Sequence, residues 1–266
     1  MHVLSYLETP PNLRKLLFPI HPDLRTAGTL PSLDMPHHLR AHEWCQYREG
    51  VTVAGPQTAQ GSEGESKRMR KSEPDAGASV VLVDAGLPNK ISIPASIPPN
   101  TRVTLKFPGS TGSSEIHSNE LIAGAVAPST PREEAGYYWG YSVRPASSLS
   151  NVFTESPYEG GYDLTIGTSE RGASISTLNH RPPDDPQLPE FNHMLIAFGG
   201  VAGLEVAVKF DEELKGMGVT DPEWLFDYWV NLCPGQGSRT IRTEEAVWLG
   251  LMGLRDIILE KGKGMK

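Results

Sequence analysis

The sequence predicts an α/β domain that is interrupted by a small all-β segment. Three observations carry this prediction. Apolar stretches that alternate with helix-like stretches begin near residue 146. Short β-branched stretches separated by turn residues occupy residues 50–145. The chain also has 266 residues, 38% of them hydrophobic, which is enough to bury a core.

Residues 1–49 form the first segment. An apolar pattern predicts a helix from His2 to about Phe18, and the pair Pro10 and Pro11 divides it into two short pieces. Residues 19–49 are rich in proline and histidine, which favours an ordered irregular loop over a long helix.

Residues 50–145 contain several short strand-like stretches. We predict strands at 51–55, 79–84, 90–93, 102–107, 121–127 and 137–143, and a flexible loop at 56–77. Strands this short and this regularly spaced are typical of a small barrel, so we expect an OB-like insert. Tyr137, Trp139 and Tyr141 alternate along the last strand, where they either pack in a core or stack on nucleic-acid bases.

Residues 146–266 return to an α/β pattern. After a helix at 147–154, apolar strands are expected at 162–167, 193–198 and 228–232. A final helix carries Val247, Leu251, Leu254 and Ile258 on one stripe, and Thr243 is its predicted cap. Alternating strands and helices predict a parallel sheet covered on both faces.

A glycine-rich turn follows each of these three strands, at 166–172, 198–205 and 231–240. Ligands of open α/β sheets bind at the carboxyl ends of strands, where glycine lets the backbone approach them. The turns therefore predict a nucleoside-like cofactor site; the alternative is three tight turns with no ligand. A P-loop is excluded because Ala173 stands where lysine is required, and 199–203 does not have the dinucleotide spacing.

The net charge of −8 excludes a histone-like basic protein, so any nucleic-acid contact must come from a local patch. The run Lys67, Arg68, Arg70 and Lys71 either binds RNA, signals nuclear import or is a solvated loop. No apolar run approaches the length of a membrane span, so no membrane partner is expected. The spacing of His37, His38, His42 and Cys45 matches no standard zinc pattern, so we predict no metal site.

The stretches Asp163–Gly172, Phe198–Gly200 and Asn231–Ala246 resemble the SPOUT superfamily of methyltransferases, in particular its eukaryotic and archaeal subfamily with an OB-like insert. Shorter stretches such as Pro36–Arg40 and Tyr138–Arg144 also match, so the resemblance covers nearly the whole chain. It implies a SPOUT-like parallel sheet with a C-terminal trefoil knot, interrupted at 50–145 by an OB-like β-barrel. In this division, residues 1–49 and 146–266 belong to one SPOUT domain.

The resemblance also implies S-adenosylmethionine (SAM) as cofactor and methylation of uridine N3 in ribosomal RNA. It further implies a homodimer and a nuclear or nucleolar location. Relatives carry a strand–helix–strand stretch before the position of Met1, so we expect the N-terminal part of the SPOUT domain to be missing. This departure leaves an alternative open, a catalytically inactive RNA-binding or assembly protein with the same fold.

The implied site residues fall into three groups. The cofactor group comprises Ile166, Gly167, Thr168, Ser169, Phe198, Gly199, Gly200, Gly203, Asn231, Cys233, Pro234, Gly235, Gly237, Ser238 and Thr240. The catalytic group comprises Arg171, Arg239 and Glu244. The two arginines would stabilise developing negative charge, and either Glu244 or Glu170 would accept the proton. Glu244 is equally well explained as a first-turn helix charge. The RNA-binding group comprises Arg144, Arg242, Lys67 and Arg68.

Overall fold

The computed structural model describes residues 1–31, 33–54, 80–109, 121–180, 182, 184 and 187–263. These residues form two compact units, Met1–Arg144 and Pro145–Lys266, which are described separately below. Among the described residues, no helix is both long and apolar enough to cross a membrane. The predicted loop at 56–77 and its basic run lie outside the described residues.

The first unit begins with two short helices, α1 (His2–Glu8) and α2 (Pro11–Leu17), so the predicted division at Pro10 and Pro11 is confirmed. Pro11 stands at the first position of α2, where its missing N–H costs no hydrogen bond. Arg14 donates from Nε to the carbonyl of Thr9 at 2.8 Å and thereby satisfies an acceptor at the end of α1. Two short 3-10 helices follow, η1 (Pro22–Leu24) and η2 (Ala27–Thr29).

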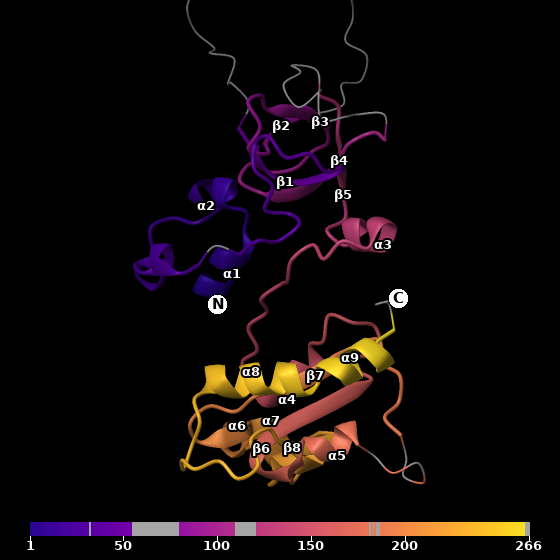
Figure 1. The fold of residues 1–266 in the computed structure, drawn as a ribbon. Coiled ribbons are helices and arrows are strands. Elements are labelled where there is room, and N and C mark those ends of the chain that lie inside the picture. Colours follow the sequence, from indigo (N-terminus) through magenta and orange to yellow (C-terminus); the bar gives the residue numbers. More distant parts are fainter. Residues whose placement is uncertain are drawn as a thin grey trace, which may run out of the picture. The chain divides into compact units, whose positions relative to one another are not determined.

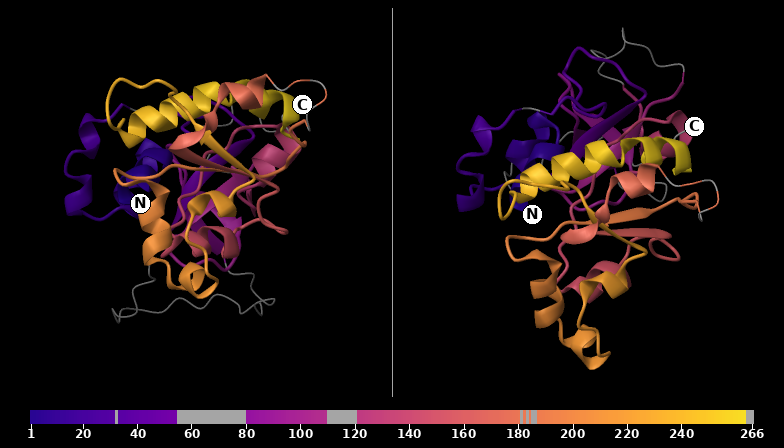
Figure 2. Two further views of the ribbon diagram at one scale, coloured as in Figure 1. Left: turned by 90° about the horizontal axis from the view of Figure 1, so that it is seen from below. Right: turned by 60° about the horizontal axis from the view of Figure 1, so that its bottom comes forward.

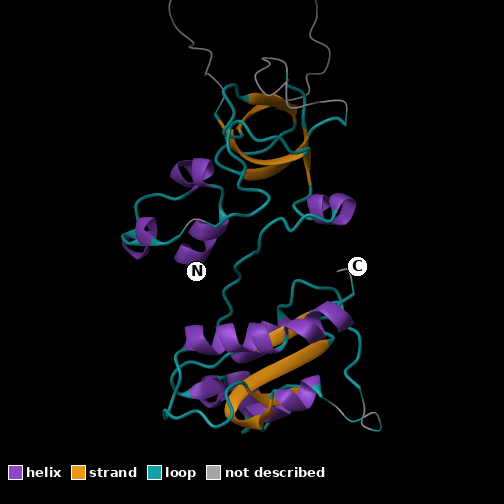
Figure 3. Cartoon of the chain, in the orientation of Figure 1, coloured by secondary structure: helices purple, strands orange, loops and turns teal. Residues whose placement is uncertain are grey.

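Five antiparallel strands make the sheet of the first unit, in the order β3-β2-β1-β4-β5. They are β1 (Tyr47–Val53), β2 (Val80–Asp84), β3 (Ile91–Pro94), β4 (Arg102–Lys106) and β5 (Gly124–Val126). The sheet curls into an incomplete barrel (Figure 3), and a bridge between Ser92 and Ile122 brings β3 close to the segment before β5. The curl encloses a core that includes Val83, Ile91, Ile93, Leu105 and Phe107. The finer assignment as an OB-like barrel stays a prediction.

The predicted strand at 137–143 is wrong. A helix, α3 (Thr130–Ala135), precedes this segment and ends at Gly136 in the left-handed conformation, and residues 137–143 then run without strand pairing. Trp139 is nevertheless buried, and its Nε1 donates to Glu49 Oε1 at 2.7 Å. Of the three alternating aromatic residues, Trp139 is therefore a buried anchor, whereas Tyr137 is 42% exposed and Tyr141 is partly exposed and donates its hydroxyl to the carbonyl of Leu4 at 2.9 Å.

The described part of the second unit contains a parallel three-stranded sheet, and parallel pairing is what the sequence predicts. Its strand order is β7-β6-β8. Its strands are β6 (Leu164–Ser174), β7 (Met194–Ala197) and β8 (Tyr228–Asn231). The helices are α4 (Leu149–Thr154), α5 (Ser176–Asn179), α6 (Gly203–Phe210), α7 (Glu212–Gly216), α8 (Thr243–Gly253) and α9 (Arg255–Lys261), with the 3-10 helix η4 (Pro222–Leu225) before β8. Helices α8 and α9 follow each other along the sheet (Figures 1 and 2).

Two hydrophobic clusters stabilise this unit. The first joins Leu164 and Ile166 of β6 to Leu178 of α5 and to Leu254 and Ile257 at α9. The second joins α4, α6 and α7 through Leu149, Val208 and Leu214. The mixed α/β class is therefore confirmed, while the trefoil knot and the assignment of residues 1–49 to the same domain as 146–266 stay predictions.

Strand β6 is longer than the predicted strand at 162–167. Its pairing with β8 shifts register between Thr168 and Ala173 and resumes at Ala173 and Ser174. Such a bulge leaves the intervening residues without a ladder partner and bends the strand. Residues 169–171 of this bulge line a pocket, and the strand continues beyond them to Ser174.

Candidate functional site

A pocket of about 280 Å³ lies in the second unit at the bulge of β6 and beside the carboxyl ends of β7 and β8. The bulge of β6, the turn between β7 and α6, and the segment between β8 and α8 form its walls. Its lining residues are Thr168–Arg171, Gly199–Gly203, Glu205, Asn231–Cys233, Gln236, Thr240, Ile241, Thr243 and Ala246. This is the location at which open α/β sheets bind ligands.

The turn between β7 and α6 requires glycine at two positions. A Cβ on Gly199 would lie 2.7 Å from the backbone of Gly203, which is closer than real Cβ atoms approach. Gly203 itself has a φ of +74°, which favours glycine, and it donates its N–H to the carbonyl of Gly200 at 2.9 Å. The backbone of residues 199–203 therefore forms a tight wall of the pocket.

Side-chain hydrogen bonds hold the other two walls. Thr168 Oγ1 donates to the carbonyl of Ala197 at 2.8 Å and joins the start of the β6 bulge to the end of β7. Asn231 connects the end of β8 to the β6 bulge, because its Nδ2 donates to the carbonyl of Glu170 at 2.8 Å. The Oδ1 of the same residue accepts from the N–H of Cys233 at 2.9 Å. Two short polar side chains thus hold the β6 bulge and the ends of β7 and β8 around the pocket.

The first turn of α8 closes the pocket from the side. Arg242, and not the predicted Thr243, caps this helix, and its N–H donates to Glu245 Oε2 at 2.9 Å. Thr243 instead lines the pocket and donates from Oγ1 to the carbonyl of Gly199 at 3.4 Å. The threonine therefore ties the start of α8 to the glycine turn.

The structure brings together part of the predicted cofactor group. The members that line the pocket are Thr168, Ser169, Gly199, Gly200, Gly203, Asn231, Cys233 and Thr240. The members outside the lining are Ile166, Gly167, Phe198, Pro234, Gly235, Gly237 and Ser238. Ile166 is fully buried in the core beneath the pocket.

The predicted catalytic residues separate in space. Arg171 lines the pocket and forms an ion pair with Glu205 of α6. Glu170 also lines the pocket. Arg239 and Glu244 are exposed and are not among the lining residues; Glu244 Oε1 lies 3.8 Å from Nη1 of Arg242. Glu205 and Ala246 also line the pocket. Each ends a stretch that the sequence marks, 198–205 and 231–246, but the sequence assigned neither residue a role.

The predicted RNA-binding residues are spread over the chain. Arg144 is exposed at the end of the first unit, and Arg242 is exposed in the second. Lys67 and Arg68 lie outside the described residues.

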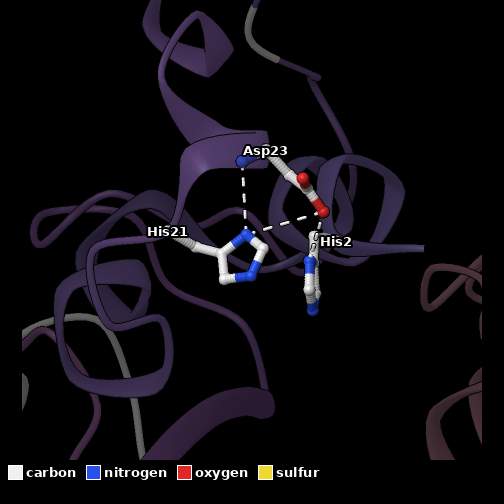
Figure 4. A group of neighbouring side chains, drawn as sticks. All are labelled: His2, His21 and Asp23. Carbon is white, nitrogen blue, oxygen red and sulfur yellow. Dashed lines mark hydrogen bonds and ion pairs between the residues drawn. The ribbon is translucent and has the colours of Figure 1, made fainter.

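A second group of chemistry-bearing side chains lies in the first unit, where His2, His21 and Asp23 point toward one another (Figure 4). Asp23 Oδ2 lies 2.6 Å from His2 Nδ1 and 3.5 Å from His21 Nδ1. The hydrogen bond with His2 lowers the pKa of the Asp23 carboxyl below its usual value. The N–H of Asp23 also donates to His21 Nδ1 at 3.2 Å, so His21 caps η1. These contacts account for the cluster without a cation, and the predicted absence of a metal site stays a prediction.

His37 and His38 are placed by the first unit's packing. His37 Nε2 lies 2.9 Å and His38 Nε2 lies 2.6 Å from the carbonyl of Glu8 at the end of α1. Both imidazoles therefore satisfy the same helix-terminal acceptor, a structural role.

In open α/β sheets, a glycine-walled pocket beside the ends of parallel strands is the usual location of a nucleotide or cofactor site. The family model described as "Putative RNA methyltransferase" matches residues 1–254, and this chain belongs to that family.

Named relatives support the same family. The chain is 43% identical over 262 residues to a mouse protein named 28S rRNA (uridine-N(3))-methyltransferase, covering 98% of this chain and 59% of the relative. It is 43% identical over 254 residues to a Drosophila melanogaster protein of the same name, covering 96% of this chain and 46% of the relative. A human protein of that name is 42% identical over 262 residues, covering 98% and 61%. The chain thus spans about half to three fifths of the length of these relatives.

Proposed function

We propose that this chain is the SAM-binding part of an RNA methyltransferase that methylates N3 of uridine in large-subunit ribosomal RNA. The observation that carries the proposal is the pocket at the strand ends of a chain 43% identical to proteins named for this reaction. The proposal extends to a C-terminal trefoil knot, a homodimer and a nuclear or nucleolar location, which the resemblance to SPOUT enzymes implies.

The residues of the pocket fit a nucleoside cofactor. The 199–203 wall is glycine-rich where a Cβ at Gly199 would collide with backbone, so main-chain groups approach the cavity directly. Thr168 and Asn231, whose side chains join the walls, and Gln236, whose Nε2 donates to the carbonyls of Ser238 and Arg239, complete a polar lining. These residues would hold SAM, which supplies a methyl group on a sulfonium when bound.

The reaction requires the protein to assist deprotonation of uridine N3 and to align the reacting atoms. Uridine N3 must lose its proton before its lone pair can attack a methyl carbon, so negative charge develops on the uracil ring. Arg171 at the pocket wall is a cation that can stabilise this charge, and Glu170 is a carboxylate beside it that can accept the proton. The pocket must also hold the reacting atoms in line, since orientation supplies a large part of the rate in such displacements.

Calorimetric titration of SAM into the 266-residue chain tests the cofactor assignment. We expect one site with micromolar affinity, and competition by S-adenosylhomocysteine, which lacks only the methyl group. A chain that is folded by circular dichroism and binds neither compound would contradict the proposal.

A further inference from the structure

The charged side chains of the pocket wall are few. Among the lining residues, Glu170, Arg171 and Glu205 carry charge, so Arg171 is the cation of this wall and two carboxylates flank it. A cation that acts on a developing anion must be held in one orientation, because a long side chain otherwise samples many rotamers.

Glu205 is placed by helix α6 and by the turn before it. It lies in the first turn of α6, two residues after Gly203. Its Oε2 occupies the space where a side chain at position 203 would begin, so Gly203 is needed both for its positive φ and to seat this carboxylate. The carboxylate is thereby folded back over the glycine turn toward the pocket.

Arg171 comes from the bulge of β6, and its Nη2 donates to Glu205 Oε1. The Arg171 side chain is 70% exposed, whereas that of Glu205 is 32% exposed. The long, exposed arginine is thus tethered by a shorter and better-buried partner. A guanidinium has five N–H donors, so Glu205 leaves most of them available to a further acceptor.

We propose that Glu205 is a positioning residue that orients Arg171 for the uridine-methylation step. Uracil that has lost its N3 proton carries its charge on N3 and on the two carbonyl oxygens, which are acceptors for the remaining N–H donors of Arg171. Glu205 Oε1 is occupied by Arg171 and does not take the proton in this scheme. The inference rests on the proposed function, because it assigns a role within that reaction.

A double-mutant cycle tests the pair. We expect Arg171→Ala and Glu205→Ala each to lower kcat by about 10- to 100-fold, the cost of a misplaced reacting group, while the Kd of SAM changes less than about threefold. The double variant should lose no more than the worse single variant, because the two residues act as one unit. Glu205→Gln should retain more activity than Glu205→Ala, because the amide oxygen can still accept from Arg171.

The pH profile separates positioning from folding. Without the oriented cation, uracil deprotonates less readily, so the rise of kcat with pH should move to higher pH in Arg171→Ala and Glu205→Ala alike. The pair Lys215 and Glu212 of α7 provides matched controls, since it is an exposed ion pair at 2.6 Å in the same unit and outside the pocket. Lys215→Ala and Glu212→Ala should leave kcat and its pH profile unchanged.

The assay uses the full chain, radiolabelled SAM and unmodified large-subunit rRNA transcribed in vitro. Two results would overturn the role of Glu205 and leave the methyltransferase proposal intact, provided that the wild type is active. The first is a Glu205→Ala variant with the same kcat as the α7 controls. The second is a double variant in which the losses in kcat of Arg171→Ala and Glu205→Ala add. A wild-type chain that transfers no methyl group to RNA overturns both.

Discussion

Arg102 of β4 holds Glu8 of α1 across 94 positions of the sequence, with Nη1 2.5 Å from Oε2 and Nη2 3.0 Å from Oε1. Such paired hydrogen bonds between a guanidinium and a carboxylate are the strong, directional form of an ion pair. His37 Nε2 lies 3.0 Å from Glu8 Oε1, and Arg102 Nε donates to Glu49 Oε2 at 2.6 Å. This buried cluster fastens the first helix to the sheet of the first unit.

Protonation of Glu8 should loosen this attachment at low pH. Burial alone would raise the pKa of Glu8, but hydrogen bonds from His37 and Arg102 outweigh it and lower the pKa to about 2 from 4.5. A lowered pKa in the folded state contributes stability that is complete above about 4.5 and disappears as the pH falls through about 2. We therefore expect Glu8→Gln to cost about 1–3 kcal/mol of unfolding free energy at pH 7.

Urea unfolding of the wild type and of Glu8→Gln at pH 7 and at low pH measures this difference. The difference in unfolding free energy should shrink steadily as the pH falls from about 4.5 to about 2. Glu134→Gln is the control, because Glu134 pairs with Lys106 at a more exposed site and should change stability less. A gap between wild type and Glu8→Gln that stays constant with pH would refute the ionic attachment.

The glycine turn between β7 and α6 offers a paired test of the pocket. Gly199→Val should weaken SAM binding at least tenfold, because its side chain would collide with the backbone of Gly203 and open the turn. Gly200→Ala should have a much smaller effect, since a Cβ there meets nothing within 4 Å. Calorimetry on both variants decides, and equal losses would mean that the geometry of this turn does not shape the cofactor site.

Asp211 is a buried polar anchor between helices α4 and α7. Its buried carboxylate accepts from the N–H of Ser150 at 2.7 Å and from the N–H of Leu214 at 3.1 Å, so it joins α4 to α7. Asp211→Ala would leave buried donors without a partner and should cost about 2–4 kcal/mol of unfolding free energy. Asp221→Ala removes a comparable but exposed cap at η4 and should cost about 1 kcal/mol or less. Similar melting temperatures for the two variants would contradict the role of Asp211.

Features of this fold that depend on neighbouring residues could be predicted from the sequence, whereas features that depend on distant residues could not. Pro10 and Pro11 mark a helix break by their own chemistry, and apolar stretches at 193–198 and 228–232 mark strands that the structure contains. The extension of β6 to Ser174 was missed, because the polar, glycine-containing stretch after Ile166 looks like a turn and pairs with β8 only through a bulge. The strand expected at 137–143 failed for the opposite reason, since its aromatic alternation had no partner strand.

The pocket likewise has features that the local sequence indicates and features that depend on distant residues. Glycine-rich turns point to it from local composition, and several of their residues line it. Glu205 ends one of these turns, but no local pattern indicates its pairing with Arg171, which lies 34 positions away in the sequence. Contacts of this kind follow from the register of the parallel strands and the start of α6, which no local pattern specifies.

Nucleoside mass spectrometry identifies the base and the atom that this chain methylates. The chain is incubated with SAM that carries a deuterated methyl group and with unmodified large-subunit rRNA transcribed in vitro, and the RNA is digested to nucleosides. We expect deuterated N3-methyluridine, which Gly199→Val should abolish. Label found in another nucleoside, or no label in RNA from a chain that binds SAM, would contradict it.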